Sequence, residues 1–445
     1  MARFTFPLLL LFIVTSSVAA ISPFEQGRPN RIPDSRIGIV EAYQAPEISR
    51  QLGVAWQRVR FHWGEIQPCG PFEWIEEEVT IQQVVNEVAS GREVVGLLIG
   101  LPAWAMDDQQ LPKGLYLAVD DPDNLWANFV RQAVLRYDGL IDHWIIWNEP
   151  DIWDAEHPGF TWPGDERDFA QLLRIAYLVT KEWNPEAVIH LPGLSHYWDA
   201  NFGKTPYLFR LVEAIEELDP AAEEYNHFFD AVTYHLYFNP VANYNLLKQY
   251  ISWLRTNDFD QPLWLIETNA APSLDPDYPV ANPQFRITLE EQSAYIPQML
   301  ALGLAAGVDH IAVYTLLDPQ KGSDPEPFGL VRIDGTLRPA ATALAVATRI
   351  FSGAISVTAQ AGGAWWWVEI ENSDRTTHVL WSGSAAPIEV EIPSQVGFAQ
   401  RVSMLGQARW VTAREGQYKV TLPGALCSND PCIIGGEPIY LIEFN

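Results

Sequence analysis

The sequence predicts a protein of the α/β class, a (β/α)8 TIM barrel followed by a small all-β sandwich domain. Short apolar runs alternate with helix-like stretches from about residue 35 to residue 318, and eight such runs recur about every 40 residues. Apolar strands that alternate with helices are typical of a parallel sheet covered by helices, and a series of eight fits a barrel. After about residue 349, short alternating segments separated by turn residues predict antiparallel strands. We therefore expect the barrel in residues 21–348 and the sandwich in residues 349–445.

The expected barrel strands are apolar runs, several of which end on polar or charged side chains. In chain order they are RIGIV (36–40), WQRVRFHW (56–63), VVGLLIGLPAW (94–104), HWIIWNEP (143–150), VIHLPGLSH (188–196), DAVTYHLYFNP (230–240), PLWLIETNA (262–270) and HIAVYTLLDP (310–319). Helical patterns lie between them, among others at 125–137, 168–183 and 290–307. A doubly wound open sheet is the competing architecture, but it does not usually need eight strands in one series.

The C-terminal part contains a run of three tryptophans, Trp365, Trp366 and Trp367, in one expected strand. Neighbouring residues of a strand point to opposite faces, so at most two of the three share a side. We expect them to pack in the core and at the domain interface rather than to form an exposed binding platform.

The N-terminus has the pattern of a secretory signal peptide. Arg3 precedes the apolar run FPLLLLFIV, and TSSVAA then offers small residues at the cleavage positions. Cleavage near Ala19 or Ala20 fits, which makes residues 1–20 the signal peptide. The apolar run is too short to span a bilayer, and no later segment reaches the ~20 apolar residues that spanning requires. We therefore expect a secreted protein, extracellular or periplasmic, without a membrane anchor.

Charge and cysteine content narrow the classes of partner and cofactor. A formal net charge of −28 argues against nucleic acid and anionic membranes as partners. Cys427 and Cys432 frame a turn-rich loop that can close as a disulfide in an oxidising compartment, and we expect Cys69 to be a buried or half-buried free thiol. No CxxC, HExxH or GxGxxG motif occurs, so we expect neither a metal site nor a bound cofactor.

Two glutamates stand at the ends of apolar runs, where a parallel barrel carries its functional face. Asn148 and Glu149 end the fourth run, and Glu267 ends the seventh. A single glutamate there can simply cap or pair in the following loop, but two at the mouth of an apolar barrel require a joint explanation. Glycosidic bond cleavage uses such a pair: one carboxyl group protonates the leaving oxygen, and the other attacks the anomeric carbon or activates water.

The second carboxyl group must stay ionised, so it needs a cation and hydrogen-bond donors. Arg58, Arg60 and His62 share one parity and make one face of the second run polar. We expect Arg60, nearer the C-terminal end of the strand, to hold the carboxylate. The alternative, which can apply to one of the two arginines, is an Arg58–carboxylate pair that ties the barrel floor together. Tyr237 shares a face with His235 at the end of the sixth run and can donate its hydroxyl to the seventh-strand glutamate. A tyrosine satisfied within the core is the alternative.

With WNEP at strand four and IET at strand seven, the sequence resembles the clan of (β/α)8 retaining glycoside hydrolases whose two catalytic glutamates lie on these strands. Families 5 and 39 are the nearest. The resemblance covers about 310 residues and includes FGLVRIDGTLRPAATAL after the eighth strand. It implies that Glu149 is the acid/base and Glu267 the nucleophile, acting on β-linked oligo- or polysaccharide, and retention implies carboxyl groups about 5–5.5 Å apart. It further implies that Asn148 binds the sugar 2-hydroxyl, that His235 lines the same subsite, and that Arg60 and Tyr237 hold the nucleophile.

One departure from the clan concerns the floor of the sugar site. Many members place a tryptophan after strand eight, but residues 308–345 contain none, so either Tyr314 substitutes for it or another loop supplies the floor. Tryptophans in or near the expected βα loops could stack against sugar rings: Trp63, Trp104, Trp153, Trp162 and Trp198. We favour Trp104. For the other four, core packing is an equal alternative.

Two other functions fit parts of the pattern. A metal-dependent hydrolase on the same barrel could use His62, His196 and His235, since three histidines can hold a catalytic zinc. The first strand supplies no His-x-His pair, however, and that function leaves the two glutamates unexplained. A non-catalytic carbohydrate-binding barrel is the second alternative, and the presence of both glutamates argues against it.

Overall fold

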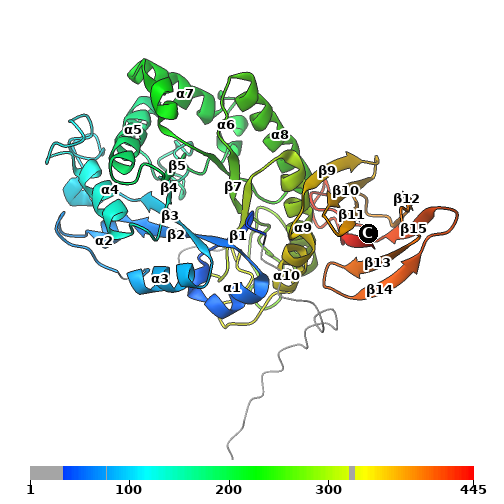
Figure 1. Cartoon of the computed structure of the whole chain (residues 1–445). Helices are drawn as coiled ribbons and strands as arrows, with labels where there is room; N and C mark the ends of the chain where they lie inside the picture. The colour runs from blue at the N-terminus through cyan, green and yellow to red at the C-terminus, as the bar shows by residue number, and fades with distance from the viewer. Residues whose placement is uncertain (1–33, 77, 320–325) are drawn as a thin grey trace, which may run out of the picture.

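The computed structural model describes residues 34–76, 78–319 and 326–445, and the expected signal peptide lies outside them. Eight parallel strands form the barrel in the order β5-β4-β3-β2-β1-β8-β7-β6, and parallel bridges between His190 and Ala231 and between Leu194 and Tyr234 join its two ends (Figure 1). The strands are β1 (Ile37–Val40), β2 (Trp56–His62), β3 (Glu93–Ile99), β4 (His143–Ile146), β5 (Val188–His190), β6 (Val232–His235), β7 (Leu263–Thr268) and β8 (His310–Val313). All eight expected strands are confirmed, and the closure excludes the open doubly wound sheet.

Helices surround this barrel, and the three that the sequence patterns predicted are present. They are α1 (Pro46–Leu52), α2 (Trp63–Ile66), α3 (Ile81–Ala89), α4 (Leu125–Arg136), α5 (Glu166–Trp183), α6 (Tyr197–Asn201), α7 (Tyr207–Leu218), α8 (Pro240–Thr256), α9 (Leu289–Ala306) and α10 (Pro339–Phe351). Three of them begin with a capping box in which the N-cap and the third helical residue exchange hydrogen bonds, at Thr80, Asp165 and Thr288. The strands are buried on both faces, as expected for a parallel sheet covered by helices.

The change to antiparallel strands falls between Phe351, where α10 ends, and Ser356. Six strands form one sheet, in the order β14-β13-β16-β11-β10-β9, and two form a second sheet. The bounds are β9 (Ser356–Ala361), β10 (Trp365–Glu371), β11 (Arg375–Ser382), β12 (Ile388–Pro393), β13 (Phe398–Ser403), β14 (Ala408–Thr412), β15 (Gln417–Leu422) and β16 (Ile439–Phe444). A separate apolar core between the sheets includes Leu380, Ile392, Leu422 and Leu441, which makes the unit the expected sandwich.

The three consecutive tryptophans of β10 pack as their alternation predicted. Trp365 and Trp367 stack on one face, with ring centroids 6.4 Å apart, against the core of the sandwich. Trp366 lies on the opposite face between Trp381 and Tyr244 of α8, at 6.2 and 5.7 Å. The expectation of core and interface packing is confirmed, and Trp366 helps to attach the sandwich to the barrel.

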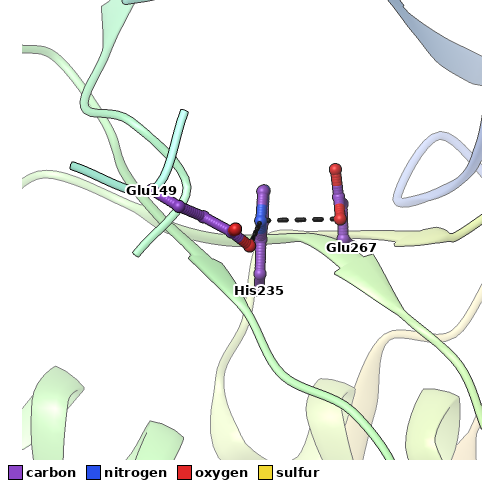
Figure 2. A group of neighbouring side chains, drawn as sticks. All are labelled: Glu149, His235 and Glu267. Atoms are coloured by element: carbon purple, nitrogen blue, oxygen red, sulfur yellow. Dashed lines mark hydrogen bonds and ion pairs between the residues drawn. The ribbon is translucent and has the colours of Figure 1, made fainter. Parts of the chain in front are cut away.

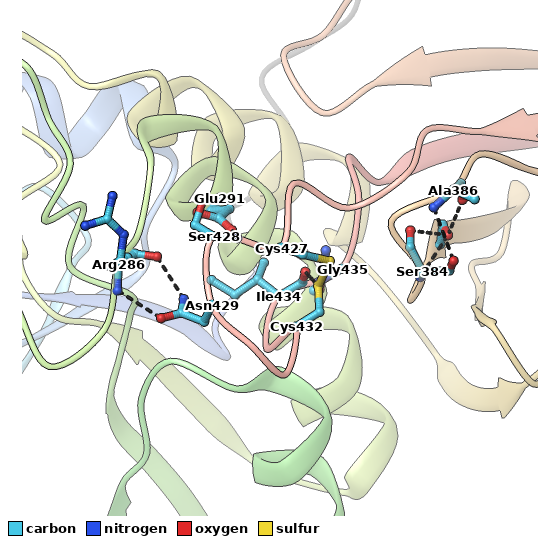
Figure 3. The surroundings of a disulfide bond; sticks show 12 residues. Arg286, Glu291, Ser384, Ala386, Cys427, Ser428, Asn429, Cys432, Ile434 and Gly435 are labelled. Atoms are coloured by element: carbon cyan, nitrogen blue, oxygen red, sulfur yellow. Dashed lines mark hydrogen bonds between the residues drawn. A yellow bond between two sulfur atoms is a disulfide. The ribbon is translucent and has the colours of Figure 1, made fainter.

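A disulfide-closed loop attaches the sandwich to the barrel at a second place (Figure 3). Cys427 and Cys432 are bonded, as the sequence allowed. Within the loop, the Asn429 side chain accepts from the Arg286 backbone N–H at 3.0 Å and donates to the Arg286 carbonyl at 2.8 Å. Glu291 of α9 accepts from the Ser428 N–H at 3.0 Å. The disulfide therefore restricts the conformation of a loop whose polar groups form hydrogen bonds with the barrel.

Two further sequence expectations concern Cys69 and membrane spans. The thiol of Cys69 is exposed, so the expectation of a buried or half-buried position was wrong. Cys69 lies in a loop after α2, between Pro68 and Gly70, where no apolar pattern directs it inward. Within the described residues, no helix combines the length and hydropathy needed to cross a membrane.

Three histidines and a tryptophan form a cluster where β4 and β8 begin. His143 Nδ1 lies 2.9 Å from His190 Nε2, and His310 stacks on Trp264 with centroids 3.7 Å apart. Burial, together with the charge of His143, lowers the pKa of His310 to about 4, and the same two effects lower that of His190. The surroundings of the cluster therefore favour the neutral form of its imidazole rings.

We expect this cluster to make the fold sensitive to acid. An unfolded histidine titrates near pH 6.5, so between that pH and about 4 the unfolded chain binds a proton at position 310 that the folded protein does not. The contribution of these histidines to stability is therefore full above pH 6.5 and falls as the pH drops, by up to ~1.4 kcal/mol per pH unit for each such group. Calorimetric melting curves between pH 7.5 and 4.5 measure this fall.

The matched control for this prediction is His310→Phe, which keeps an aromatic ring against Trp264. Its melting temperature should fall less steeply with acid than that of the wild type, because one titrating group has been removed. An identical slope for the two proteins would show that His310 does not contribute to the acid sensitivity.

Candidate active site

The two glutamates singled out in the sequence meet at the C-terminal ends of the strands, on either side of His235 (Figure 2). His235 Nδ1 lies 2.6 Å from Glu149 Oε1 and 3.5 Å from Glu267 Oε2. One oxygen of each glutamate lies within 4.8 Å of the other. The barrel thus brings together two carboxyl groups that are 118 positions apart in the chain.

The backbone after β4 turns sharply to present Glu149. Trp147 and Glu149 both have left-handed backbone angles, φ 70° and 45°, which are uncommon for residues other than glycine. The turn is held from the β5 side, where the Gly193 carbonyl accepts the Glu149 N–H at 3.0 Å, and by the buried Trp147 ring, whose Nε1 donates to the Thr161 carbonyl at 3.2 Å. Backbone strain of this kind persists only where the surroundings impose it, and it is concentrated at functional sites.

A buried aspartate, Asp151, ties the loop that carries Glu149 to the loop after β5. One of its carboxylate oxygens accepts from the Ser195 N–H and hydroxyl, both at 2.8 Å, and from the His196 N–H at 3.0 Å. Burial, and then the nearby charge of Glu149, raises the pKa of Asp151 to about 7. Asp151 therefore positions the loop that carries Glu149, and its own pKa depends on the charge of Glu149.

Glu267 is the more buried of the two glutamates, with 6% of its surface exposed. Burial alone would favour its neutral form, but the Arg58 guanidinium, His235 and the Tyr237 hydroxyl together hold the pKa of Glu267 below its ordinary value. Arg58 forms an ion pair with one carboxylate oxygen, and Tyr237 donates to the other. These contacts therefore favour an ionised carboxylate although the side chain is buried.

Aromatic rings from the segments that follow β6 and β8 pack around Tyr237, which donates to Glu267. Tyr314 follows β8, and its ring stands at right angles to that of Tyr237, with centroids 6.1 Å apart. Phe328 contacts both rings, at 5.2 and 5.5 Å. Tyr314 thus follows β8 directly and packs against the tyrosine that donates to Glu267.

The expectation that Arg60 holds the seventh-strand carboxylate was wrong, because Arg58 pairs with Glu267 instead. Arg58 is level with Val40, the last residue of β1, whereas β2 continues four residues further, to His62. Arg60 therefore projects above the rim, where its half-exposed side chain pairs with Glu78 and lies 3.8 Å from Glu65. The alternation of side chains along β2 identified the correct face of the strand. Which arginine on that face lies level with Glu267 depends on how far β2 extends beyond its neighbours.

Substitution of the two arginines should separate their roles. We expect Arg58→Met to lower kcat/KM by about 10²–10³-fold, because it removes the cation that favours an ionised Glu267 and leaves that carboxyl group buried. The pKa of Glu267 then rises, so the acidic limb of the rate profile moves to higher pH. Arg60→Met is the matched control, with an expected loss below about tenfold because its ion pairs are solvent-exposed.

The pH profile is the decisive readout for this pair of variants. Arg58→Lys, which restores a positive charge without the guanidinium fork, should recover part of the acidic limb. Equal losses in Arg58→Met and Arg60→Met, with unshifted profiles, would contradict the assignment of Arg58.

Gly193 is required by the imidazole beside it. A Cβ atom at this position would lie 1.9 Å from His235 Nε2. We therefore expect Gly193→Ala to displace the ring that contacts both carboxyl groups and to lower kcat at least about tenfold, since small displacements of catalytic groups carry such costs. Gly70→Ala is the control, because a Cβ there meets nothing within 4 Å. Steady-state kinetics on both variants test this, and full activity of Gly193→Ala would contradict the assigned position of His235.

Asn148 and the loop tryptophans are the remaining residues that the sequence placed at the site. Asn148 precedes Glu149 and forms a parallel bridge with Gly193, so it lies at the site. Trp104 follows β3 and is half-buried: its Nε1 donates to the Gln67 carbonyl at 2.6 Å, and its ring packs edge-on against Trp63. Of the other loop tryptophans, Trp63 and Trp162 are buried in the core, whereas Trp153 is 37% exposed and Trp198 is half-buried.

Sequence reasoning missed Glu41, which follows β1 directly. Burial raises its pKa, against the opposing effect of Arg58 and Arg60, and the charge of Glu267 acts in the same direction as burial. Its carboxylate accepts from Gln44 Nε2 at 2.6 Å. The rule that found the two catalytic candidates, a carboxylate directly after an apolar run, applies equally to GIVE at 38–41.

The three histidines of the metal alternative do not come together. His196 Nδ1 contacts the Tyr250 hydroxyl at 2.7 Å, and His62 faces Glu65 at 4.0 Å. Among the described residues, the single group with ligand atoms close enough to share an ion is Glu149, His235 and Glu267. The Arg58 guanidinium already neutralises one of these carboxylates, which opposes a divalent cation there.

Comparison with known proteins places the fold. No protein-family model and no curated protein sequence matches the chain. A family 39 glycoside hydrolase from the gut symbiont Bacteroides cellulosilyticus WH2 matches with a TM-score of 0.69 and 17% identity, over 93% of this chain and 82% of that one. A monomeric beta-xylosidase from Caulobacter crescentus CB15 has a TM-score of 0.59 and 16% identity, over 94% and 98%. A GH30 endoxylanase from Clostridium papyrosolvens C71 has a TM-score of 0.57 and 12% identity, over 94% and 98%. The chain therefore shares its (β/α)8 barrel and C-terminal β-domain with glycoside hydrolases of families 39 and 30.

Proposed function

We propose that the protein is a retaining glycoside hydrolase that cleaves β-linked O-glycosidic bonds of oligo- or polysaccharides. The observation that carries this proposal is the pair Glu149 and Glu267, with one oxygen of each within 4.8 Å of the other. Inverting enzymes keep their carboxyl groups about 6.5–9.5 Å apart to admit a water molecule, whereas retaining enzymes use about 5–5.5 Å.

In the first step, the ionised Glu267 attacks the anomeric carbon and forms a glycosyl ester, while Glu149 donates its proton to the leaving oxygen. Arg58 and Tyr237 support the ionised form of Glu267 before attack. These contacts become weaker as the carboxylate forms the new bond and loses its negative charge. They therefore stabilise the resting enzyme more than the transition state, and stronger contacts would slow the attack.

In the second step, the now ionised Glu149 takes a proton from water, and the resulting nucleophile attacks the anomeric carbon and releases Glu267. The Glu149 side chain is 19% exposed, so the water that it deprotonates in the second step can reach it, while Glu267 stays enclosed. The two environments therefore suit the two roles.

The comparisons support the class of substrate. The structural neighbours include a beta-xylosidase and a GH30 endoxylanase, which makes β-xylosides the first substrates to test. Tyr314 and Phe328 pack against Tyr237, which supports the proposal that Tyr314 takes the place of the tryptophan that the clan resemblance implies.

The proposal is tested by following the product with proton NMR during hydrolysis of a panel of aryl β-glycosides that begins with β-xyloside. We expect the β-anomer to form first and then to mutarotate. Initial release of the α-anomer would overturn the retaining mechanism, and no hydrolysis of any glycoside in the panel or of its oligosaccharides would overturn the enzymatic assignment.

A metal-dependent hydrolase is the second candidate, favoured by the clustering of Glu149, His235 and Glu267. Activity that survives dialysis against a chelator is expected from the two-carboxylate mechanism. Loss of activity on dialysis and its return with Zn²⁺ would favour the metal instead.

We also propose that the protein is exported before it acts. The N-terminal pattern supports a signal peptide, and the Cys427–Cys432 disulfide fits an oxidising compartment. N-terminal sequencing of the protein recovered from the culture medium or periplasm should begin near Ile21.

A further inference from the structure

An exposed group of aromatic side chains lies on the loops after β4 and β5. It consists of Trp153, Trp198 and Phe202, which we call the loop platform. Trp153 is 37% exposed and Phe202 56%. The rings contact one another at centroid distances of 5.0–5.8 Å. Large exposed aromatic groups on a soluble protein mark binding surfaces more often than single exposed residues do.

The platform shares its loops with the candidate active site. Trp153 lies four residues after Glu149 and two after Asp151. Because Asp151 accepts hydrogen bonds from Ser195 and His196, it ties the first loop to the segment that leads into α6, which carries Trp198. The same clamp thus positions the acid/base candidate and the aromatic surface.

The chemistry of the reaction indicates what lies on this side of the site. The general acid protonates the oxygen of the leaving group, so the leaving group lies toward Glu149 and the reacting sugar toward Glu267. A sugar ring presents an apolar C–H face, which suits an indole or phenyl ring, and hydroxyl groups at its rim. The Lys204 ammonium covers one face of the Trp153 ring at 3.6 Å, and it can donate to the hydroxyl groups of a sugar that stacks on the exposed ring surface that remains.

We propose that the loop platform of Trp153, Trp198 and Phe202 is a subsite for a sugar unit on the leaving-group side of the cleaved bond. The preferred substrate is then an oligo- or polysaccharide that extends beyond Glu149, rather than a glycoside with a small leaving group. This inference rests on the proposed retaining mechanism and adds the direction in which the substrate extends.

The test uses the glycosyl-enzyme trapped with an activated 2-deoxy-2-fluoro-β-glycoside. Acceptors that bind the leaving-group side speed the release of the trapped sugar by transfer, so the full chain is incubated with xylobiose, with cellobiose, or with methanol, which needs no subsite. We expect at least one disaccharide to release the wild-type intermediate faster than methanol does at equal concentration.

In Trp153→Ala the ratio of disaccharide to methanol release should fall about tenfold, the order of effect of one lost aromatic contact. Phe202→Ala, at a more exposed position, should lower the same ratio. Trp183→Ala is the matched control, because this tryptophan is 48% exposed at the far end of α5, and its ratio should equal that of the wild type.

Each other outcome is decisive. An unchanged ratio in both platform variants overturns the subsite, and so does a wild-type intermediate that responds to methanol alone; the platform would then face a protein partner or solvent. If the protein hydrolyses the corresponding glycosides but none of the fluorosugars forms an intermediate, the retaining mechanism itself fails, and the subsite fails with it.

Discussion

We expect Glu267→Ala to lower kcat/KM by at least about 10⁴-fold, which corresponds to ~5.4 kcal/mol of lost transition-state stabilisation. Without this carboxylate no glycosyl ester can form, and the remaining groups only orient the substrate and donate a proton. The measurement is hydrolysis of an aryl glycoside with and without sodium azide. Azide can enter the space left by the side chain and attack the anomeric carbon directly, so it should restore turnover and yield the α-glycosyl azide, with inverted configuration.

Glu267→Gln is the companion variant, because alanine also leaves Arg58 buried without its ion-pair partner. The amide keeps the shape of the carboxylate and can accept from Tyr237, so the fold should survive while activity stays low. A binding protein without catalysis would behave differently, since it would have no turnover to lose. Azide that yields a β-azide from Glu267→Ala would contradict the assignment of this residue as the nucleophile.

The second large effect is expected at Glu149. Glu149→Ala should lower the rate by about 10²–10⁴-fold for substrates whose leaving group needs protonation, the usual contribution of general acid catalysis. For 2,4-dinitrophenyl glycosides, whose leaving group departs as the anion, the first step should be much less affected. The kinetics of a series of aryl glycosides with leaving groups of different pKa measure this dependence.

Azide again distinguishes the roles. In Glu149→Ala it should attack the intermediate held on Glu267 and give the β-glycosyl azide, with net retention, because the vacated side is that of the leaving group. Losses of equal size on all leaving groups would contradict the acid/base role. Glu65→Ala, which removes an exposed glutamate near Arg60, serves as the control for loss of negative charge at the rim.

The strands and the pair of glutamates could be predicted because both are encoded locally. Each barrel strand is a short apolar run bounded by turn or helix signals, and a carboxylate at its end stands out against that run. Glu149 and Glu267 meet because parallel strands of one barrel end on one face, which is a property of the fold class and needs no exact coordinates. The same reasoning correctly placed Tyr237 against Glu267.

Relations that depend on the stagger between strands could not be predicted in this way. Arg58 and Arg60 have the same parity, and only the register with β1 shows that Arg58 is level with Val40 at the end of its neighbour. Asp151 was overlooked because a polar residue in a loop gives no periodic signal, although its three hydrogen bonds to the β5 loop bury it completely.

The sequence pattern also does not predict which loop tryptophans are exposed. Trp63 and Trp153 both follow the ends of barrel strands, yet Trp63 stacks on Phe129 of α4 in the core while Trp153 remains partly exposed. The difference depends on whether a helix from elsewhere in the chain covers the loop, which is a tertiary property. Whether such a side chain is buried by residues far away in the sequence can therefore be read only from the structure.

The measurement that tests this account most directly is the intact mass of the protein after incubation with activated 2-deoxy-2-fluoro-β-glycosides, followed by peptide mapping. The fluorine slows both steps, and the activated leaving group lets the first one proceed, so a retaining enzyme accumulates its glycosyl ester. We predict a mass gain of one fluorosugar, located on Glu267, which identifies the nucleophile, the mechanism and the preferred sugar together. A gain located on another carboxylate such as Glu41, or no gain from any sugar of the panel while the protein hydrolyses the corresponding glycosides, would contradict it.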